Sequence, residues 1–125
     1  MMTNPSTTNL PLVYACSGCS NIAQLANDVA IALDRTGKAE MSCIAGVGGG
    51  VLPLIKKAQS GRHIIAIDGC VLHCVKHCLN NASVVPDAHV TLTDHGFRKR
   101  HHEACNEADL EKALSLVSPL LTAKT

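Results

Sequence analysis

Residues 63–70 read His-Ile-Ile-Ala-Ile-Asp-Gly-Cys, and this stretch decides the fold. Its nearly continuous apolar run, His63–Ile67, is typical of a strand that is covered on both faces. Asp68-Gly69 then turns the chain, and a helical pattern opened by Cys70 continues over Val71–Leu79. A buried strand that leads directly into a helix is the unit from which parallel sheets are built.

The same unit recurs on both sides of this stretch. The expected strands are Leu12–Ala15, a segment around Glu40–Ala45, His63–Ile67 and Ala88–Thr93, and the expected helices are Asn21–Arg35, Val51–Ser60, Val71–Leu79 and Glu107–Val117. This alternation predicts an α/β fold: a single three-layer domain with a four-stranded parallel, doubly wound sheet and helices on both faces. We expect the strand order 2-1-3-4, a flexible tail over residues 1–10 and the domain over residues 11–125. Sites in such sheets lie at the carboxyl ends of the strands, here between the first and third strands.

The composition excludes several functional classes. The net charge is +1 and the only aromatic residues besides histidine are Tyr14 and Phe97, so we expect neither a nucleic-acid nor a membrane partner. The chain shows no signal-peptide pattern and no apolar stretch of about 20 residues, which favours a cytoplasmic protein with reduced thiols. Seven cysteines, an odd number, make a disulfide framework a poor explanation. Metal binding or thiol chemistry is the better one.

The cysteines follow the predicted strands, which brings them to one edge of the sheet. Cys16 and Cys19 follow the first strand, Cys43 the second and Cys70 the third. On a continuous helix Cys74 would lie about 6 Å along the axis from Cys70, within reach of a shared ion, whereas Cys78 would lie about 12 Å away. Zinc is the ion that best suits a thiolate site, and we expect one Zn²⁺ per chain. The candidate ligands are Cys16, Cys19, Cys43, Cys70 and Cys74.

Two alternatives to a working metal site remain open. Cys16 and Cys19 could form a redox pair, with Cys70 as a third partner, in an enzyme of disulfide, persulfide or arsenical chemistry. The loop of phosphatases and arsenate reductases is missing, because no arginine lies between Cys16 and Arg35. The other alternative is an interaction module with a purely structural zinc. The sequence assigns no catalytic residue.

Other clusters carry weaker signals. Gly46–Gly50 lacks both the dinucleotide fingerprint and the phosphate-loop lysine, so a tight turn beside the site is expected. Several polar residues are expected to have structural roles only. We expect solvent-facing positions for His73, His77 and the run Arg98-Lys99-Arg100, and a role in caps or turns for Asp68 and Asp94. His101, His102 and Cys105 have the spacing of a second, adventitious metal site.

The motifs together resemble those of the DGC-domain family of small zinc-binding proteins. They are Cys16-Ser-Gly-Cys-Ser-Asn21, Gln24-Leu-Ala-Asn27, Met41-Ser-Cys43, Ile67-Asp-Gly-Cys70 with Cys74, and Leu92-Thr-Asp94. The resemblance implies zinc held by four cysteines with Asp68-Gly69-Cys70 at the centre; by position these are Cys16, Cys43, Cys70 and Cys74. The family commonly has a small residue where this chain has Cys19. This chain therefore has five candidate thiols for the four ligand positions of the zinc. The resemblance implies no particular reaction.

Overall fold

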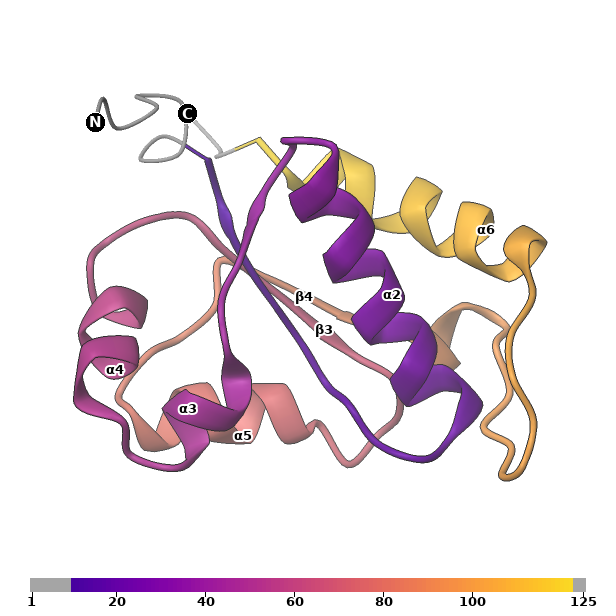
Figure 1. Cartoon of the computed structure of the whole chain (residues 1–125), viewed down its shortest axis with the longest axis horizontal. Coiled ribbons are helices and arrows are strands. Elements are labelled where there is room, and N and C mark those ends of the chain that lie inside the picture. Colours follow the sequence, from indigo (N-terminus) through magenta and orange to yellow (C-terminus); the bar gives the residue numbers. More distant parts are fainter. Residues whose placement is uncertain (1–9, 123–125) are drawn as a thin grey trace.

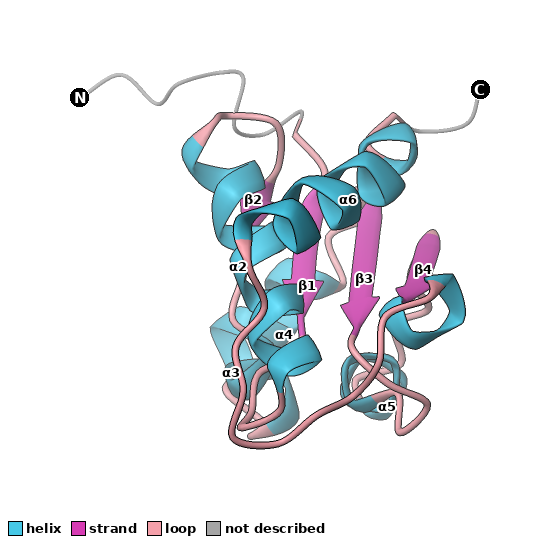
Figure 2. Cartoon of the chain, turned by 90° about the vertical axis from the view of Figure 1, so that its right-hand side faces the viewer, coloured by secondary structure: helices cyan, strands magenta, loops and turns pink. Residues whose placement is uncertain are grey.

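Four parallel strands form one sheet in the order β2-β1-β3-β4, which confirms the predicted topology (Figure 1). The strands are β1 (Leu12–Ala15), β2 (Glu40–Met41), β3 (Ile64–Asp68) and β4 (Ala88–Thr91). This computed structural model describes residues 10–122. Except for Leu10, the tail predicted over residues 1–10 lies outside the described residues. Figure 2 shows β1, β3 and β4 pointing in the same direction, with their carboxyl ends at one edge.

Helices cover both faces of the sheet, as the three-layer prediction required. They are α2 (Asn21–Arg35), α3 (Ile44–Gly48), α4 (Leu52–Ala58), α5 (Cys74–Asn81) and α6 (Glu107–Val117), with short 3₁₀ turns η1 (Leu92–His95) and η2 (Ser118–Leu120). Because side chains alternate along a strand, Val13 and Ile65 pack beneath α2 and α6, whereas Tyr14 and Ala66 pack beneath α3, α4 and α5. Among the described residues, no helix combines the length and the apolar character that crossing a membrane requires.

The first unit, β1 and α2, has the bounds that the sequence predicted. The Ser20 hydroxyl accepts a hydrogen bond from the Ala23 amide at 3.1 Å, which caps the start of α2. Gly37 follows the helix with φ +74°, a left-handed conformation that glycine adopts without strain. Both local signals agree with the apolar face of α2, which is why this unit was predictable.

The second strand is shorter than predicted, and its expected end belongs to a helix. β2 stops at Met41, and α3 occupies Ile44–Gly48, where the sequence had suggested the strand end and most of a glycine-rich turn. The cause is the Cys43 side chain, whose Sγ accepts a hydrogen bond from the Gly46 amide at 3.3 Å and so caps α3. The glycines allow close packing here, since a Cβ on Gly48 would lie 2.9 Å from the Cys78 sulfur.

The third predicted helix begins later than expected, and this changes the spacing of its thiols. His73 precedes α5 in the left-handed conformation, with φ +53°, so Cys70 lies in a turn before the helix. Asp68 sets the start, because its carboxylate accepts hydrogen bonds from the amides of Val75 at 2.8 Å and Lys76 at 3.3 Å. Cys70 and Cys74 are therefore not one helical turn apart, and the predicted stripe through Cys70 is wrong.

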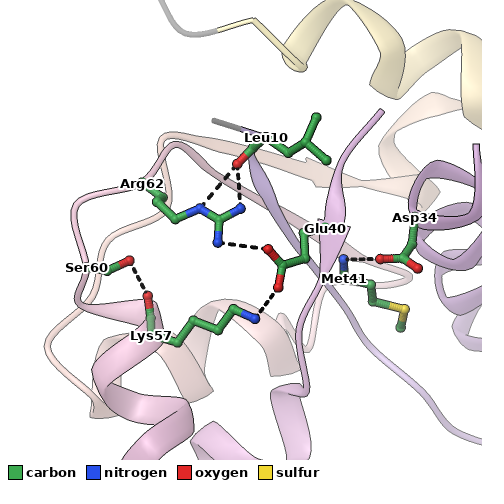
Figure 3. A network of polar contacts seen from close by, with 7 residues as sticks. All are labelled: Leu10, Asp34, Glu40, Met41, Lys57, Ser60 and Arg62. Atoms are coloured by element: carbon green, nitrogen blue, oxygen red, sulfur yellow. Dashed lines mark hydrogen bonds and ion pairs between the residues drawn. The ribbon is translucent and has the colours of Figure 1, made fainter. Parts of the chain in front are cut away.

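A charged network holds β2 at the amino-terminal end of the sheet (Figure 3). Glu40 forms ion pairs with Lys57 of α4 and with Arg62, whose Nη1 lies 2.9 Å from Oε1. Arg62 also donates two hydrogen bonds to the Leu10 carbonyl, at 2.7 and 3.2 Å. Burial by itself would raise the pKa of Glu40, but the bonds from Lys57 and Arg62 lower this pKa below its usual value.

Replacing Glu40 with Gln should lower the free energy of unfolding at pH 7 by about 1–2 kcal/mol. The lowered pKa means that the stabilisation is fully present above the unfolded value of about 4.3 and is lost as the pH falls through the folded value. Urea titrations from pH 7 to pH 3 should therefore show the two proteins converging in acid. Glu111→Gln, at an exposed position of α6, is the control and should change little. A Glu40→Gln deficit that persists unchanged at pH 3 would contradict this account.

Candidate thiol site at the switch point of the sheet

The loops after β1 and β3 meet between neighbouring strands, at the switch point where sites in doubly wound sheets lie. They form a pocket with a volume of about 170 Å³. Four of the five predicted thiols line this thiol pocket: Cys16, Cys19, Cys70 and Cys74. Lys99 and His101, from the segment between η1 and α6, complete the wall. Residues more than 80 positions apart in sequence therefore meet here.

The thiols of the pocket differ in their surroundings. Cys16 is half-buried, and its Sγ accepts a hydrogen bond from the Gly69 amide at 3.1 Å. Burial raises the pKa of Cys16 to about 11, although the Gly69 bond opposes the change and the negative charge of Asp68 adds to it. In the absence of metal, Cys16 is therefore a neutral thiol at pH 7. Cys19 and Cys74 are exposed, and Cys70 is half-buried.

Cys70 is distinguished by a neighbouring cation. Lys99 Nζ donates a hydrogen bond to Cys70 Sγ at 3.5 Å. Cys70 also lies directly after Gly69, whose carbonyl accepts a hydrogen bond from the Thr93 amide at 3.1 Å. The turn that carries Cys70 is thus tied to Cys16 in the loop after β1 and to η1, and a positive charge faces the Cys70 sulfur.

Cys43 lies at the same edge of the sheet but outside the thiol pocket. It follows β2 by two residues and is exposed, and its Sγ serves as the cap of α3. The structure therefore brings together the four thiols that adjoin β1 and β3, and it does not bring Cys43 to them. Its role as a ligand, which the family resemblance implied, stays a prediction.

The donor chemistry of the pocket suits a soft metal ion, although the donors are not arranged around one point. Four thiols are the set that zinc takes in structural sites. Within residues 10–122, no three His, Cys, Asp or Glu side chains are placed so that they could hold one ion as they stand. Zinc would thus require thiols of the pocket to move toward a common point.

Behind the pocket lies a polar chain that the sequence analysis missed. Asp68 is 1% exposed, and its Oδ2 lies 2.8 Å from Nε2 of His89 on β4. The His89 ring meets the ring of His73 edge to face, with centroids 4.9 Å apart. His73 Nε2 in turn lies 3.0 Å from Thr91 Oγ1. The sequence signal that could have predicted this polar chain is the pair of alternating polar residues on β4, His89 and Thr91.

The remaining histidines and cysteines have separate places. His73 is half-buried, contrary to the prediction that it faces solvent, whereas His77 is exposed as expected. His101 lines the thiol pocket, but Cys105 donates a hydrogen bond to the Asn21 carbonyl at 3.5 Å. Cys78, expected in the core or in a separate feature, is half-buried close to Gly48 of α3. Burial raises the pKa of both Cys78 and Cys105.

Together, the fold and the site define a small parallel α/β protein with a thiol-lined pocket at its switch point. The profile of the DGC domain matches residues 12–117, and the chain belongs to the DGC domain family. It is also 60% identical over 113 residues to the "Anaerobic and virulence modulator AnvM" of Pseudomonas aeruginosa, an alignment that covers 90% of this chain and 86% of that relative. No solved structure matches the chain.

Proposed function

We propose that this protein binds one Zn²⁺ through cysteine thiolates of the thiol pocket and acts in metal handling or sensing in the cytoplasm. The observation that supports it is the convergence of Cys16, Cys19, Cys70 and Cys74 on one pocket at the switch point. The core is extensive on both faces of the sheet, so we expect the fold to survive without a metal. All seven cysteines are free thiols, which suits a reducing compartment.

A second candidate function is thiol chemistry without metal, in which the thiols of the pocket react with small sulfur or arsenic compounds. Two observations favour it. Lys99 Nζ donates a hydrogen bond to Cys70 Sγ at 3.5 Å, so a cation lies beside one thiol of the pocket. The relative AnvM is named an anaerobic modulator, a name that suits a response to redox conditions.

Metal content decides between the two candidates. Untagged protein prepared without oxygen should contain about one zinc per chain, measured by plasma mass spectrometry. Cys70→Ser should lose most of that zinc, because it removes a sulfur from the pocket. Cys78→Ser is the matched control: it removes a thiol that lies outside the pocket, and it should retain the metal.

Thiol counts complete the test. Under the metal proposal, about four thiols should become reactive only after chelation, and the far-ultraviolet circular dichroism spectrum should survive chelation. Metal-free protein with two thiols missing until reduction would overturn the metal proposal and support a redox pair formed by Cys16 and Cys19. Unfolding on chelation would instead identify the zinc as structural.

A further inference from the structure

The segment that carries Lys99 runs beside the amino-terminal end of α2 (Figure 1), where hydrogen bonds to Asn21 anchor it. The residue Asn21 is buried, with 8% of its surface exposed. Its Nδ2 donates to the Arg98 carbonyl at 2.9 Å, and its Oδ1 accepts from the Arg100 amide at 2.6 Å. The Asn21 amide donates to the Arg100 carbonyl at 3.0 Å. These three bonds grip the backbone on both sides of Lys99.

The anchoring places a positive charge at the wall of the thiol pocket. Lys99 contacts Cys70 Sγ, and His101, two residues further along the chain, also lines the pocket. No acidic side chain among the described residues lines this pocket, and none of them pairs with Lys99. Arg100 is different, since it lies 3.6 Å from Glu103. The carboxylate of Asp68, behind the pocket, is occupied by His89 and by two amides of α5.

We propose that the thiol pocket selects small anionic sulfur compounds, namely thiols or disulfides that carry a carboxylate. Lys99 recognises the carboxylate, the thiol wall contacts the sulfur, and Asn21 is the positioning residue for Lys99. The pocket has a volume of about 170 Å³, which suits a small molecule. This inference rests on the thiol chemistry that is the second candidate function, and it uses the same residues.

Small disulfides of different charge test the selection. The metal-free protein is treated with dithiodiglycolate, which is anionic, or with 2-hydroxyethyl disulfide, which is neutral. A pocket thiolate attacks one sulfur of the probe, so the S–S bond of the probe breaks and a protein–probe disulfide forms. The other half leaves as a thiolate, and the proton of the protein thiol passes to solvent. Intact-mass spectrometry gives each rate, and peptide mapping should place the modification at Cys70.

The ratio of the anionic to the neutral rate constant is the decisive quantity. A change in the intrinsic reactivity of Cys70 affects both probes and cancels in this ratio. The unmodified chain should prefer the anionic probe, and Lys99→Gln should reduce that ratio about five-fold, the effect of one unit charge at about 4 Å in water. The preference should also weaken at high salt. Lys38→Gln removes an exposed charge outside the pocket and is the matched control, which should leave the ratio unchanged.

Asn21→Ala tests the positioning role. It should reduce the ratio as Lys99→Gln does while leaving the lysine in place, and the double variant should show no further reduction. Equal rates for the two probes in the unmodified chain, or a ratio that Lys99→Gln leaves intact, would overturn the inference. Zinc content is measured separately: Lys99 is not a ligand, so Lys99→Gln should bind as much zinc as the unmodified chain. A failure of the zinc proposal and a failure of anion selection are thus distinguishable.

Discussion

Replacing Asp68 with Ala should lower the free energy of unfolding by about 3–5 kcal/mol, which is a large part of the stability of a small domain. The carboxylate is 1% exposed and accepts hydrogen bonds from the amides of Val75 and Lys76. It also pairs with His89 at 2.8 Å. Its removal leaves two amides at the start of α5 and an imidazole without their acceptor in a place that water does not easily reach.

Urea unfolding measures the loss, and amide hydrogen exchange locates it. In Asp68→Ala, the amides of Val75 and Lys76 should exchange faster than in the unmodified chain. Asp68→Asn keeps the shape of the side chain and one acceptor oxygen, so its free energy of unfolding should lie between those of Asp68→Ala and the unmodified chain. His77→Ala, at an exposed position of the same helix, is the control and should cost less than about 0.5 kcal/mol. If Asp68→Ala and His77→Ala are equally stable, the carboxylate does not hold α5.

Replacing Gly69 with Ala should destabilise the protein by about 1–3 kcal/mol and should loosen the thiol pocket. A Cβ at this position would lie 3.0 Å from the carbonyl carbon and oxygen of Ile22 and 3.1 Å from the Ala23 amide nitrogen. These are backbone atoms of α2, which cannot rotate away as a side chain can. The turn must therefore shift, and the hydrogen bond from the Gly69 amide to Cys16 Sγ is lost or weakened.

Gly18→Ala provides a matched control on the facing loop. Its Cβ would make an ordinary contact with the Ala23 side chain at 3.6 Å, so the change should be close to neutral. Besides the urea midpoint, the amide of residue 69 should exchange with solvent faster in Gly69→Ala, because it loses Cys16 Sγ as its acceptor, and its exchange should stay unchanged in Gly18→Ala. A Gly69→Ala protein with unchanged stability and unchanged amide exchange at residue 69 would show that the two loops do not pack as described.

These two variants give the Asp-Gly-Cys motif a physical meaning. Asp68 accepts hydrogen bonds from amides in the first turn of α5, and Gly69 allows the turn after β3 to approach the backbone of α2. The third residue, Cys70, then lies in the thiol pocket beside Lys99. The motif thus combines two residues that shape the pocket with one that supplies its chemistry.

The sequence by itself determined the α/β class, the strand order and the bounds of β1, α2 and α6. The class and the bounds follow from local signals, namely apolar periodicity, the Ser20 cap and Gly37, because side chains near in sequence decide them. The strand order was the default arrangement for right-handed crossovers. The sequence also indicated that the cysteines gather at one edge, since the carboxyl ends of parallel strands share that edge.

Only the tertiary structure decided where α5 begins, which thiols share a pocket and which cation faces them. The start of α5 depends on Asp68, seven residues before the amide of Val75 that it binds, and on the pairing of Asp68 with His89 from another strand. Cys16 and Cys70 share the pocket although they follow different strands, and Lys99 reaches Cys70 because Asn21 holds its segment. Contacts between residues this far apart in sequence leave no periodic trace in it, since packing of whole elements creates them.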